Sequence, residues 1–248
     1  MQVTNGIEML EISATIMGKA NVIHPTLIWD KDIVILVDTG YPGQLPLLRE
    51  AMEKASIPFD KLSKILITHQ DIDHIGNLPT ILKESPQRVE VLANEVEKPY
   101  IQGEKRLLKL TPEAIAQAMN SLPAEMPEER RKAFKVALEN PPKANVDKMI
   151  ADEEELPYCG GIIVINTPGH TPGHICLYHK KTKTLIAGDA MKVVDGQLLG
   201  PDPRPTLDMN LAIKSLKKLT QYDIEAVICY HGGLYNGDAN QCIAELAL

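Results

Sequence analysis

Cysteine is scarce in this sequence, and its few copies form no close pair. The 248 residues contain four cysteines, Cys159, Cys176, Cys229 and Cys242, and no CxxC motif. Cys176 and Cys229 lie in apolar runs that are typical of strands, which indicates buried free thiols. We therefore expect a reduced, cytoplasmic protein.

Long hydrophobic runs and blocks of positive charge are also missing. No apolar stretch approaches the roughly 18 residues of a membrane-spanning helix. The N-terminus carries early acidic residues and lacks a basic segment followed by an apolar one. The net charge is −7 without a Lys/Arg-rich block, so no nucleic-acid partner is expected. These absences predict a soluble protein that acts on a small molecule, with no membrane as partner.

What the sequence does contain is two similar series of strand patterns, each accompanied by helices. Alternating or β-branched apolar runs predict strands, and apolar residues at helical spacing predict helices. The predicted strands are Glu8–Ile16, Val22–Trp29, Ile33–Asp38, Lys64–Thr68, Val89–Ala93, Ile162–Asn166, Ile175–Tyr178, Thr184–Ala187, Lys192–Val194 and Ala226–Tyr230. The predicted helices are Leu45–Lys54, His74–Lys83, Asp208–Leu219 and Ala239–Leu246. This order is typical of a mixed α/β protein with two packed sheets.

The segment between the two series differs in composition. Residues 95–156 are rich in Glu, Lys, Ala, Met and Pro, with helical patterns at 112–121 and 128–138. A strand-poor insertion of this length is typical of a lid or cap. A dimerisation arm, which would make the protein a homodimer, is the alternative. We expect one domain over residues 1–248 with a helical insertion at about 95–156.

Histidine and aspartate gather where the predicted strands end. The clearest case is "THQDIDHIG", which follows an apolar run directly, and the same residue types recur in "NTPGHTPGH", "LIAGDA" and "ICYHGG". The residues concerned are His69, Asp71, Asp73, His74, His170, Asp189 and His231. Imidazole and carboxylate are the usual ligands of zinc, iron and manganese, and strand ends hold ligands rigidly. The sequence therefore predicts a metal site.

Together with Asp38 of "VDTG", these motifs resemble those of the metallo-β-lactamase fold superfamily, in order and spacing, over nearly the whole chain. The resemblance implies a four-layer αββα sandwich with two metal ions at one edge between the sheets and a bridging hydroxide as nucleophile. The ligands that it implies are His69 and His170 for the first ion, Asp73, His74 and His231 for the second, and Asp189 for both. Asp73 would also be catalytic, and Asp38 would be a supporting residue.

Asp71 departs from the family pattern, because members usually carry HxHxDH where this chain has HxDxDH. With Asp71 as a ligand, three carboxylates and one hydroxide cancel the charge of two divalent cations. An extra anionic oxygen should weaken the first ion as a Lewis acid and favour harder ions. Two divalent ions are expected, with zinc as the leading ion and manganese or iron as the alternatives because of Asp71. Asp71 could instead contact a ligand without touching the ion.

The leading hypothesis is a dinuclear metal-dependent hydrolase of a small-molecule ester, thioester, lactone, amide or phosphodiester. A flavodiiron-like protein that reduces dioxygen or nitric oxide is one alternative, because such relatives carry an acidic residue at the position of Asp71. Against it, the chain ends at Leu248, and we expect no flavin domain. A relative that binds a ligand or metal without turnover is the other alternative, and the fold cannot identify the substrate. Among the remaining histidines, we expect structural roles for His24 and His174 and a solvated turn for His179.

Overall fold

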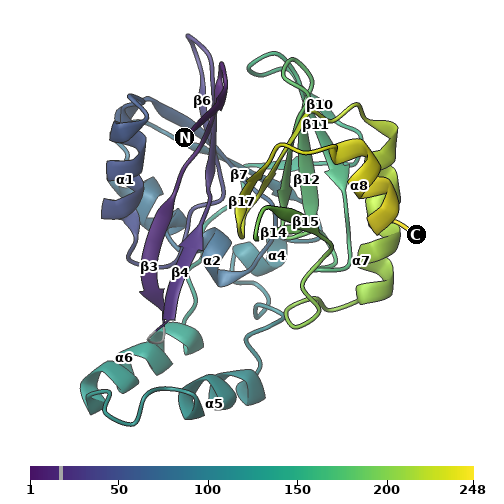
Figure 1. Ribbon diagram of the computed structural model, residues 1–248. Coiled ribbons are helices and arrows are strands. Elements are labelled where there is room, and N and C mark those ends of the chain that lie inside the picture. The colour runs from purple at the N-terminus through teal and green to yellow at the C-terminus, as the bar shows by residue number, and fades with distance from the viewer. Residues whose placement is uncertain (17–18) are drawn as a thin grey trace.

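Two β-sheets pack face to face, and helices cover their outer sides (Figure 1). The computed structural model describes residues 1–16 and 19–248. One outer layer contains α1 (Leu45–Lys54), and the opposite one contains α7 (Met209–Leu216) and α8 (Ala239–Leu246). This arrangement confirms the predicted four-layer αββα sandwich.

The first sheet has seven strands in the order β1-β2-β5-β6-β7-β8-β9. These strands are β1 (Gln2–Thr4), β2 (Ile7–Met9), β5 (Thr26–Trp29), β6 (Val34–Val37), β7 (Leu62–Ile67), β8 (Glu90–Asn94) and β9 (Lys148–Ile150). The strands from β6 to β9 pair in parallel. Their carboxyl ends therefore meet at one edge of the sheet, where side chains from the following loops can converge.

The second sheet has six strands in the order β10-β11-β12-β13-β16-β17. These strands are β10 (Glu155–Leu156), β11 (Ile162–Asn166), β12 (Ile175–His179), β13 (Thr184–Gly188), β16 (Ala226–Cys229) and β17 (Gly233–Tyr235). The parallel pair β13–β16 brings Asp189 and His231 to one edge. Two further sheets have two strands each: β3 (Ile12–Ile16) pairs with β4 (Lys19–Ile23), and β14 (Lys192–Val194) pairs with β15 (Gln197–Leu199).

Successive residues of the central strands face different cores. In β7, Ile65 and Ile67 join the cluster that includes Leu48 of α1, whereas Leu66 lies between the two sheets. This alternation follows from the twofold side-chain period of a strand. Both faces of β7 are covered, which explains the continuous apolar run in its sequence. Cys176 and Cys229, in the second sheet, are also buried, and both are free thiols as predicted.

Several predicted elements are divided in the structure. The predicted strand Glu8–Ile16 was wrong as a single element, because its residues belong to β2 and β3 in different sheets. The predicted strand Val22–Trp29 breaks between β4 and β5, around Pro25. The predicted helix His74–Lys83 is two helices, α2 (Ile72–Ile75) and α3 (Leu78–Glu84). Pro79 lacks the N–H that would continue α2 by bonding the carbonyl of Ile75.

The central segment contains helices as expected, but it also contains the strands β9 and β10. Its helices are α4 (Lys98–Ile101), α5 (Pro112–Asn120) and α6 (Glu128–Glu139). Helices α5 and α6 pack on each other outside the sandwich, below it in Figure 1. No helix in the described ranges is long and apolar enough to cross a membrane.

Gly76 lies where α2 meets the turn after β6, and we predict that Gly76→Ala is strongly destabilising. A Cβ at this position would lie 2.3 Å from the carbonyl oxygen of Gly40 and 2.4 Å from backbone atoms of Tyr41 and Pro42. Because backbone atoms cannot move aside cheaply, the free energy of unfolding should fall by roughly 3 kcal/mol or more. Urea unfolding measures this difference. Gly200→Ala, whose Cβ would have only Leu246 Cδ2 near it at 3.9 Å, is the control, and equal effects of the two variants would contradict the prediction.

Candidate metal centre

The seven predicted histidines and aspartates lie together at one edge of the sandwich, in two groups. The first group contains His69, Asp71, His170 and Asp189, and the second contains Asp73, His74 and His231. Within each group, one potential ligand atom per residue lies within 4.8 Å of the others. The first sheet supplies the loop after β7, and the second sheet supplies the loops after β11, β13 and β16. Neither sheet alone could build the site.

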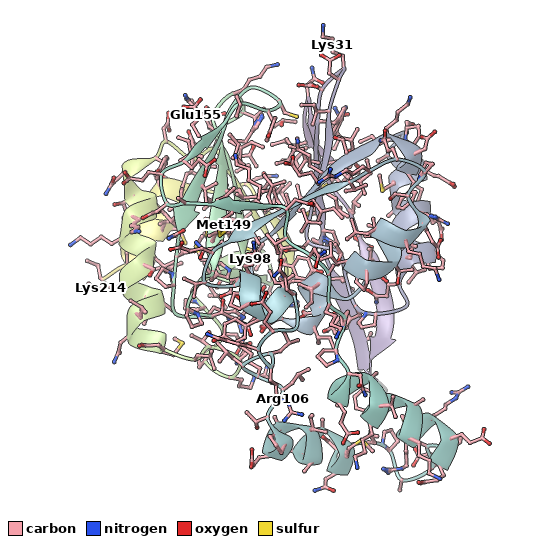
Figure 2. All side chains as sticks on the ribbon, turned by 180° about the vertical axis from the view of Figure 1, so that it is seen from behind. Lys31, Lys98, Arg106, Met149, Glu155 and Lys214 are labelled. Carbon is pink, nitrogen blue, oxygen red and sulfur yellow. The ribbon has the colours of Figure 1, made fainter. Side chains whose placement is uncertain are left out.

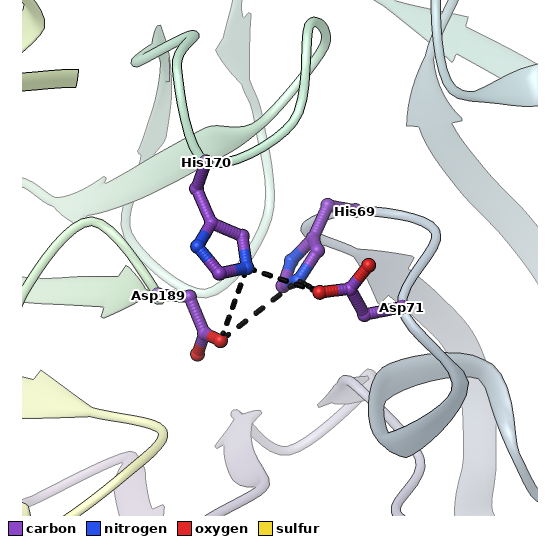
Figure 3. A group of neighbouring side chains, drawn as sticks. All are labelled: His69, Asp71, His170 and Asp189. Carbon is purple, nitrogen blue, oxygen red and sulfur yellow. Dashed lines mark hydrogen bonds and ion pairs between the residues drawn. The ribbon is translucent and has the colours of Figure 1, made fainter. Parts of the chain in front are cut away.

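In the first group, two histidines and two carboxylates face a common point (Figure 3). Oδ2 of Asp71 lies 3.0 Å from Nε2 of His170 and 3.2 Å from Nε2 of His69. On the other side, Oδ2 of Asp189 lies 3.3 Å from Nε2 of His170 and 4.0 Å from Nε2 of His69. Asp71 therefore points into the group from the opposite side to Asp189.

Asp189 connects the two groups. Its Oδ1 lies 3.5 Å from Nε2 of His74, and its Oδ2 lies 3.5 Å from Nε2 of His231. Its backbone N–H donates to Nε2 of His174, at 3.0 Å. Gly188 has φ +52, and a Cβ there would lie 2.8 Å from the same nitrogen of His174. His174 thus has the structural role expected of it, since it holds the backbone of Asp189.

Asp38 orients His74 from behind. Its carboxylate accepts hydrogen bonds from the N–H and the hydroxyl of Thr68, at 2.9 and 2.8 Å, and lies 2.8 Å from Nδ1 of His74. With its proton on Nδ1, His74 presents the lone pair of Nε2 to the second group. Asp38 adopts φ +60, a strained backbone conformation for a residue other than glycine.

The donor set fits a divalent cation. Among the described residues, the buried atoms without a hydrogen-bond partner include Nε2 of His69, Nε2 of His74 and Oδ1 of Asp189. A buried polar atom left unpaired costs about 1–3 kcal/mol, and all three of these atoms face the interior of the site. Imidazole nitrogen and carboxylate oxygen are suitable ligands for zinc, manganese or iron.

The carboxylates and histidines of the two groups shift one another's pKa values. Burial alone would raise the pKa of Asp71 and Asp189, but the neighbouring histidines hold both pKa values well below the usual range. Burial would lower the pKa of His231, but the carboxylates of Asp189 and Asp73 raise it to about 10. The site therefore stabilises positive charge, as a cation-binding site must.

A cavity of about 610 Å³ opens onto both groups. The ligand-type side chains in its wall are Asp71, Asp73, His170, Asp189 and His231, and the others include Asn21, Tyr41, Met191, Lys192 and Arg204. Arg204 is exposed and pairs with Asp202, 3.3 Å away. A small molecule can therefore reach the ligand atoms from solvent.

Two charged residues of the site, Glu97 and Lys109, were not predicted from the sequence. Glu97 is fully buried and accepts hydrogen bonds from the backbone and side chain of Gln70, both at 2.9 Å, and from the N–H of Gly173 at 2.7 Å. It therefore ties the loop of His69 to the loop of His170. Lys109 contacts Asp71 and His170 directly. Both residues lie in the central segment, whose composition resembles that of an exposed helical surface.

The two remaining histidines, His24 and His179, belong to neither group. His24 is buried, with Nδ1 3.0 Å from the carbonyl oxygen of Leu10, which agrees with a structural role. His179 was wrongly predicted to lie in a solvated turn. It ends β12, is buried, and has Nε2 2.8 Å from the carbonyl oxygen of Cys159.

The family model of the metallo-beta-lactamase superfamily matches residues 19–231. The chain belongs to this superfamily. It is 28% identical over 232 residues to the probable metallo-hydrolase YflN of Bacillus subtilis, covering 86% of this chain and 80% of that protein. It is also 30% identical over 206 residues to the metallo-beta-lactamase fold-containing protein ST1585 of Sulfurisphaera tokodaii, covering 82% and 69% of the two chains.

Solved structures agree with the fold. The metallo-beta-lactamase family protein TTHA1429 of Thermus thermophilus superposes with a TM-score of 0.68 at 24% identity, covering 99% of this chain and 79% of that one. A metallo-beta-lactamase from Pontibacter korlensis superposes with a TM-score of 0.68 at 16% identity, covering 100% and 97%. At this level of identity, the superpositions show a shared fold and do not identify a substrate.

We predict that Glu97→Gln destabilises this superfamily member. A glutamine amide has one oxygen, so at least one of the N–H groups of Gln70 and Gly173 would face another donor. The lost hydrogen bond should reduce the free energy of unfolding by about 1–3 kcal/mol in urea unfolding. Glu95→Gln, at an exposed position two residues earlier, should change it by less than about 0.5 kcal/mol. Identical midpoints for wild type and Glu97→Gln would show that the carboxylate does not hold the two loops.

Proposed function

We propose that this protein is a dinuclear metal-dependent hydrolase of a small molecule with an ester, thioester, lactone, amide or phosphodiester bond. One observation carries the proposal: two histidine–aspartate groups share Asp189 and open onto one cavity. The membership of the superfamily and the relatives named probable metallo-hydrolases support it. The proposed substrate is a small molecule that contains one of these bonds.

The proposed ligands follow the two groups. His69, Asp71 and His170 would hold the first ion, and Asp73, His74 and His231 the second, with Asp189 shared. Bound divalent cations would polarise a carbonyl or phosphoryl oxygen and lower the pKa of bound water. Zinc is the proposed ion. Manganese or iron is the alternative, because Asp71 would add an anionic oxygen to the first group.

Side chains of the chain itself would orient the substrate and move protons. Asp73 lines the cavity beside His231, with its Oδ2 3.3 Å from Nε2 of His231. Because its carboxylate faces the cavity, it would accept a proton during hydrolysis. Tyr41 lines the same cavity, and burial together with the charge of Asp73 raises its pKa above the usual value. Its hydroxyl stays protonated and can donate a hydrogen bond to a substrate oxygen.

We predict that wild-type protein binds about two metal ions per chain and that His231→Ala loses the ion of the second group, which contains Asp73, His74 and His231. Inductively coupled plasma mass spectrometry of the purified protein, reloaded with Zn²⁺, Mn²⁺ or Fe²⁺, measures the stoichiometry. Hydrolysis of an ester, thioester, lactone, amide and phosphodiester panel should fall at least roughly 100-fold in His231→Ala, because the second ion is lost. Arg204→Ala, at the cavity rim, should keep both ions. Well-folded wild-type protein that takes up no specific metal would contradict the proposal.

We also predict that Asp71 sets the metal preference. Asp71→His removes an anionic oxygen and restores the common family pattern, and Asp71→Asn removes the charge while nearly keeping the shape. The affinity for Zn²⁺ relative to Mn²⁺ should rise in Asp71→His, because imidazole nitrogen suits zinc whereas carboxylate oxygen suits manganese. The ratio should change less in Asp71→Asn, which keeps an oxygen donor, but the affinity of the first group for either ion should fall. Competition dialysis with both ions measures the ratio. If both variants keep the wild-type ratio and stoichiometry, Asp71 is not a ligand.

A further inference from the structure

The side-chain nitrogen of Lys109 lies among the ligand atoms of the first group. It donates to Oδ2 of Asp71 and to Nε2 of His170, the latter at 2.7 Å. These two acceptors are 3.0 Å apart, so both face the same ammonium group. A metal ion in the first group would require the same two atoms to face it in the same way.

The ammonium group and a metal ion cannot both use His170. An imidazole nitrogen has one lone pair in the plane of its ring. The lone pair of Nε2 can accept a hydrogen from Lys109, or it can bind a metal at about 2.0–2.1 Å. Nδ1 of His170 is directed elsewhere, 3.3 Å from the hydroxyl of Thr206. Binding of an ion by His170 therefore requires that the ammonium group leave.

We propose that Lys109 is a built-in cation of the first group, which a metal ion must displace, so that the second group fills first. This inference rests on the proposed metal-dependent function. The charges support it. Asp71, Asp73 and Asp189 carry three negative charges, and one divalent cation in the second group together with the ammonium of Lys109 balances them. Asp71, the departure from the family pattern, is the carboxylate that Lys109 neutralises.

The backbone around Lys109 is held in place, whereas its side chain has room to move. Leu107 is buried in the core, and the N–H of Leu108 donates to Oε1 of Gln70 at 2.8 Å. A cavity of about 170 Å³, lined in part by Leu107, Leu110 and Lys109 itself, lies beside the first group. The displaced side chain can move into this space while the loop stays anchored.

This arrangement connects the first group to the helical insertion. Lys109 lies three residues after Arg106, at the connection through which the chain leaves the sandwich toward α5 (Figure 2). Lys109 belongs to this insertion and reaches the first group through its contacts with Asp71 and His170.

Stepwise metal binding tests the inference. Chelator-treated protein is dialysed against increasing free Zn²⁺ or Mn²⁺, and bound metal is counted by mass spectrometry. Wild type should bind one ion tightly and another more weakly. Lys109→Met and Lys109→Gln remove the charge, and the weaker step should tighten roughly 10- to 100-fold because no charged hydrogen bond opposes it. Lys105→Met, at an exposed position in the same loop, should bind as wild type does.

Acetylation of lysine amines gives a second measurement that does not depend on affinity. Peptide mass spectrometry should find Lys109 modified slowly with up to one equivalent of metal and faster with two, while Lys105 reacts equally throughout. The inference would be overturned if the weaker binding step were unchanged or weaker still in both Lys109 variants. It would also be overturned if the acetylation rate of Lys109 were the same with one and with two equivalents of metal. Either result would leave the proposed function standing. Absence of specific metal binding in all variants would overturn both.

Discussion

The carboxylate of Asp189 is the element on which the rest of the site depends. It lies within 3.3 to 4.0 Å of Nε2 atoms on four histidines, which come from loops of both sheets. A buried carboxylate is tolerated only when hydrogen bonds or cations compensate its lost hydration. The backbone N–H of Asp189, held by His174, fixes where this charge lies. The sandwich therefore places a negative charge at the seam between its sheets and surrounds it with groups that can share a cation.

The surrounding network keeps these groups rigid. Asp38 and Thr68 orient His74 from the first sheet, and Glu97 ties the loop of Gln70 to that of Gly173 on the second. Each link joins segments far apart in the chain, so the site forms only when both sheets pack. Rigid placement of ligands is what a metal site requires to hold its coordination geometry. The same packing that stabilises the fold thus also builds the candidate centre.

Much of the site was predictable because its chemistry follows strands directly. The run before His69 is apolar and β-branched, which indicates a buried strand, and the polar cluster after it lies at the strand's carboxyl end. Asp189 and His231 follow the same rule. The boundaries of the strands were harder to predict. The residues predicted as one strand, Glu8–Ile16, divide between two sheets, and the apolar pattern gives no sign of the division. Glu97 and Lys109 could not be found, because their roles depend on long-range contacts with Gln70, Gly173, Asp71 and His170.

Anomalous X-ray diffraction tests the central claim most directly. Crystals of zinc-loaded protein, measured on both sides of the zinc absorption edge, should show one anomalous peak in each histidine–aspartate group, with the carboxylate of Asp189 between them. At limiting zinc, the peak in the group of Asp73, His74 and His231 should dominate. Zinc peaks confined to surface residues, with none within ligand distance of Asp189, would contradict the account.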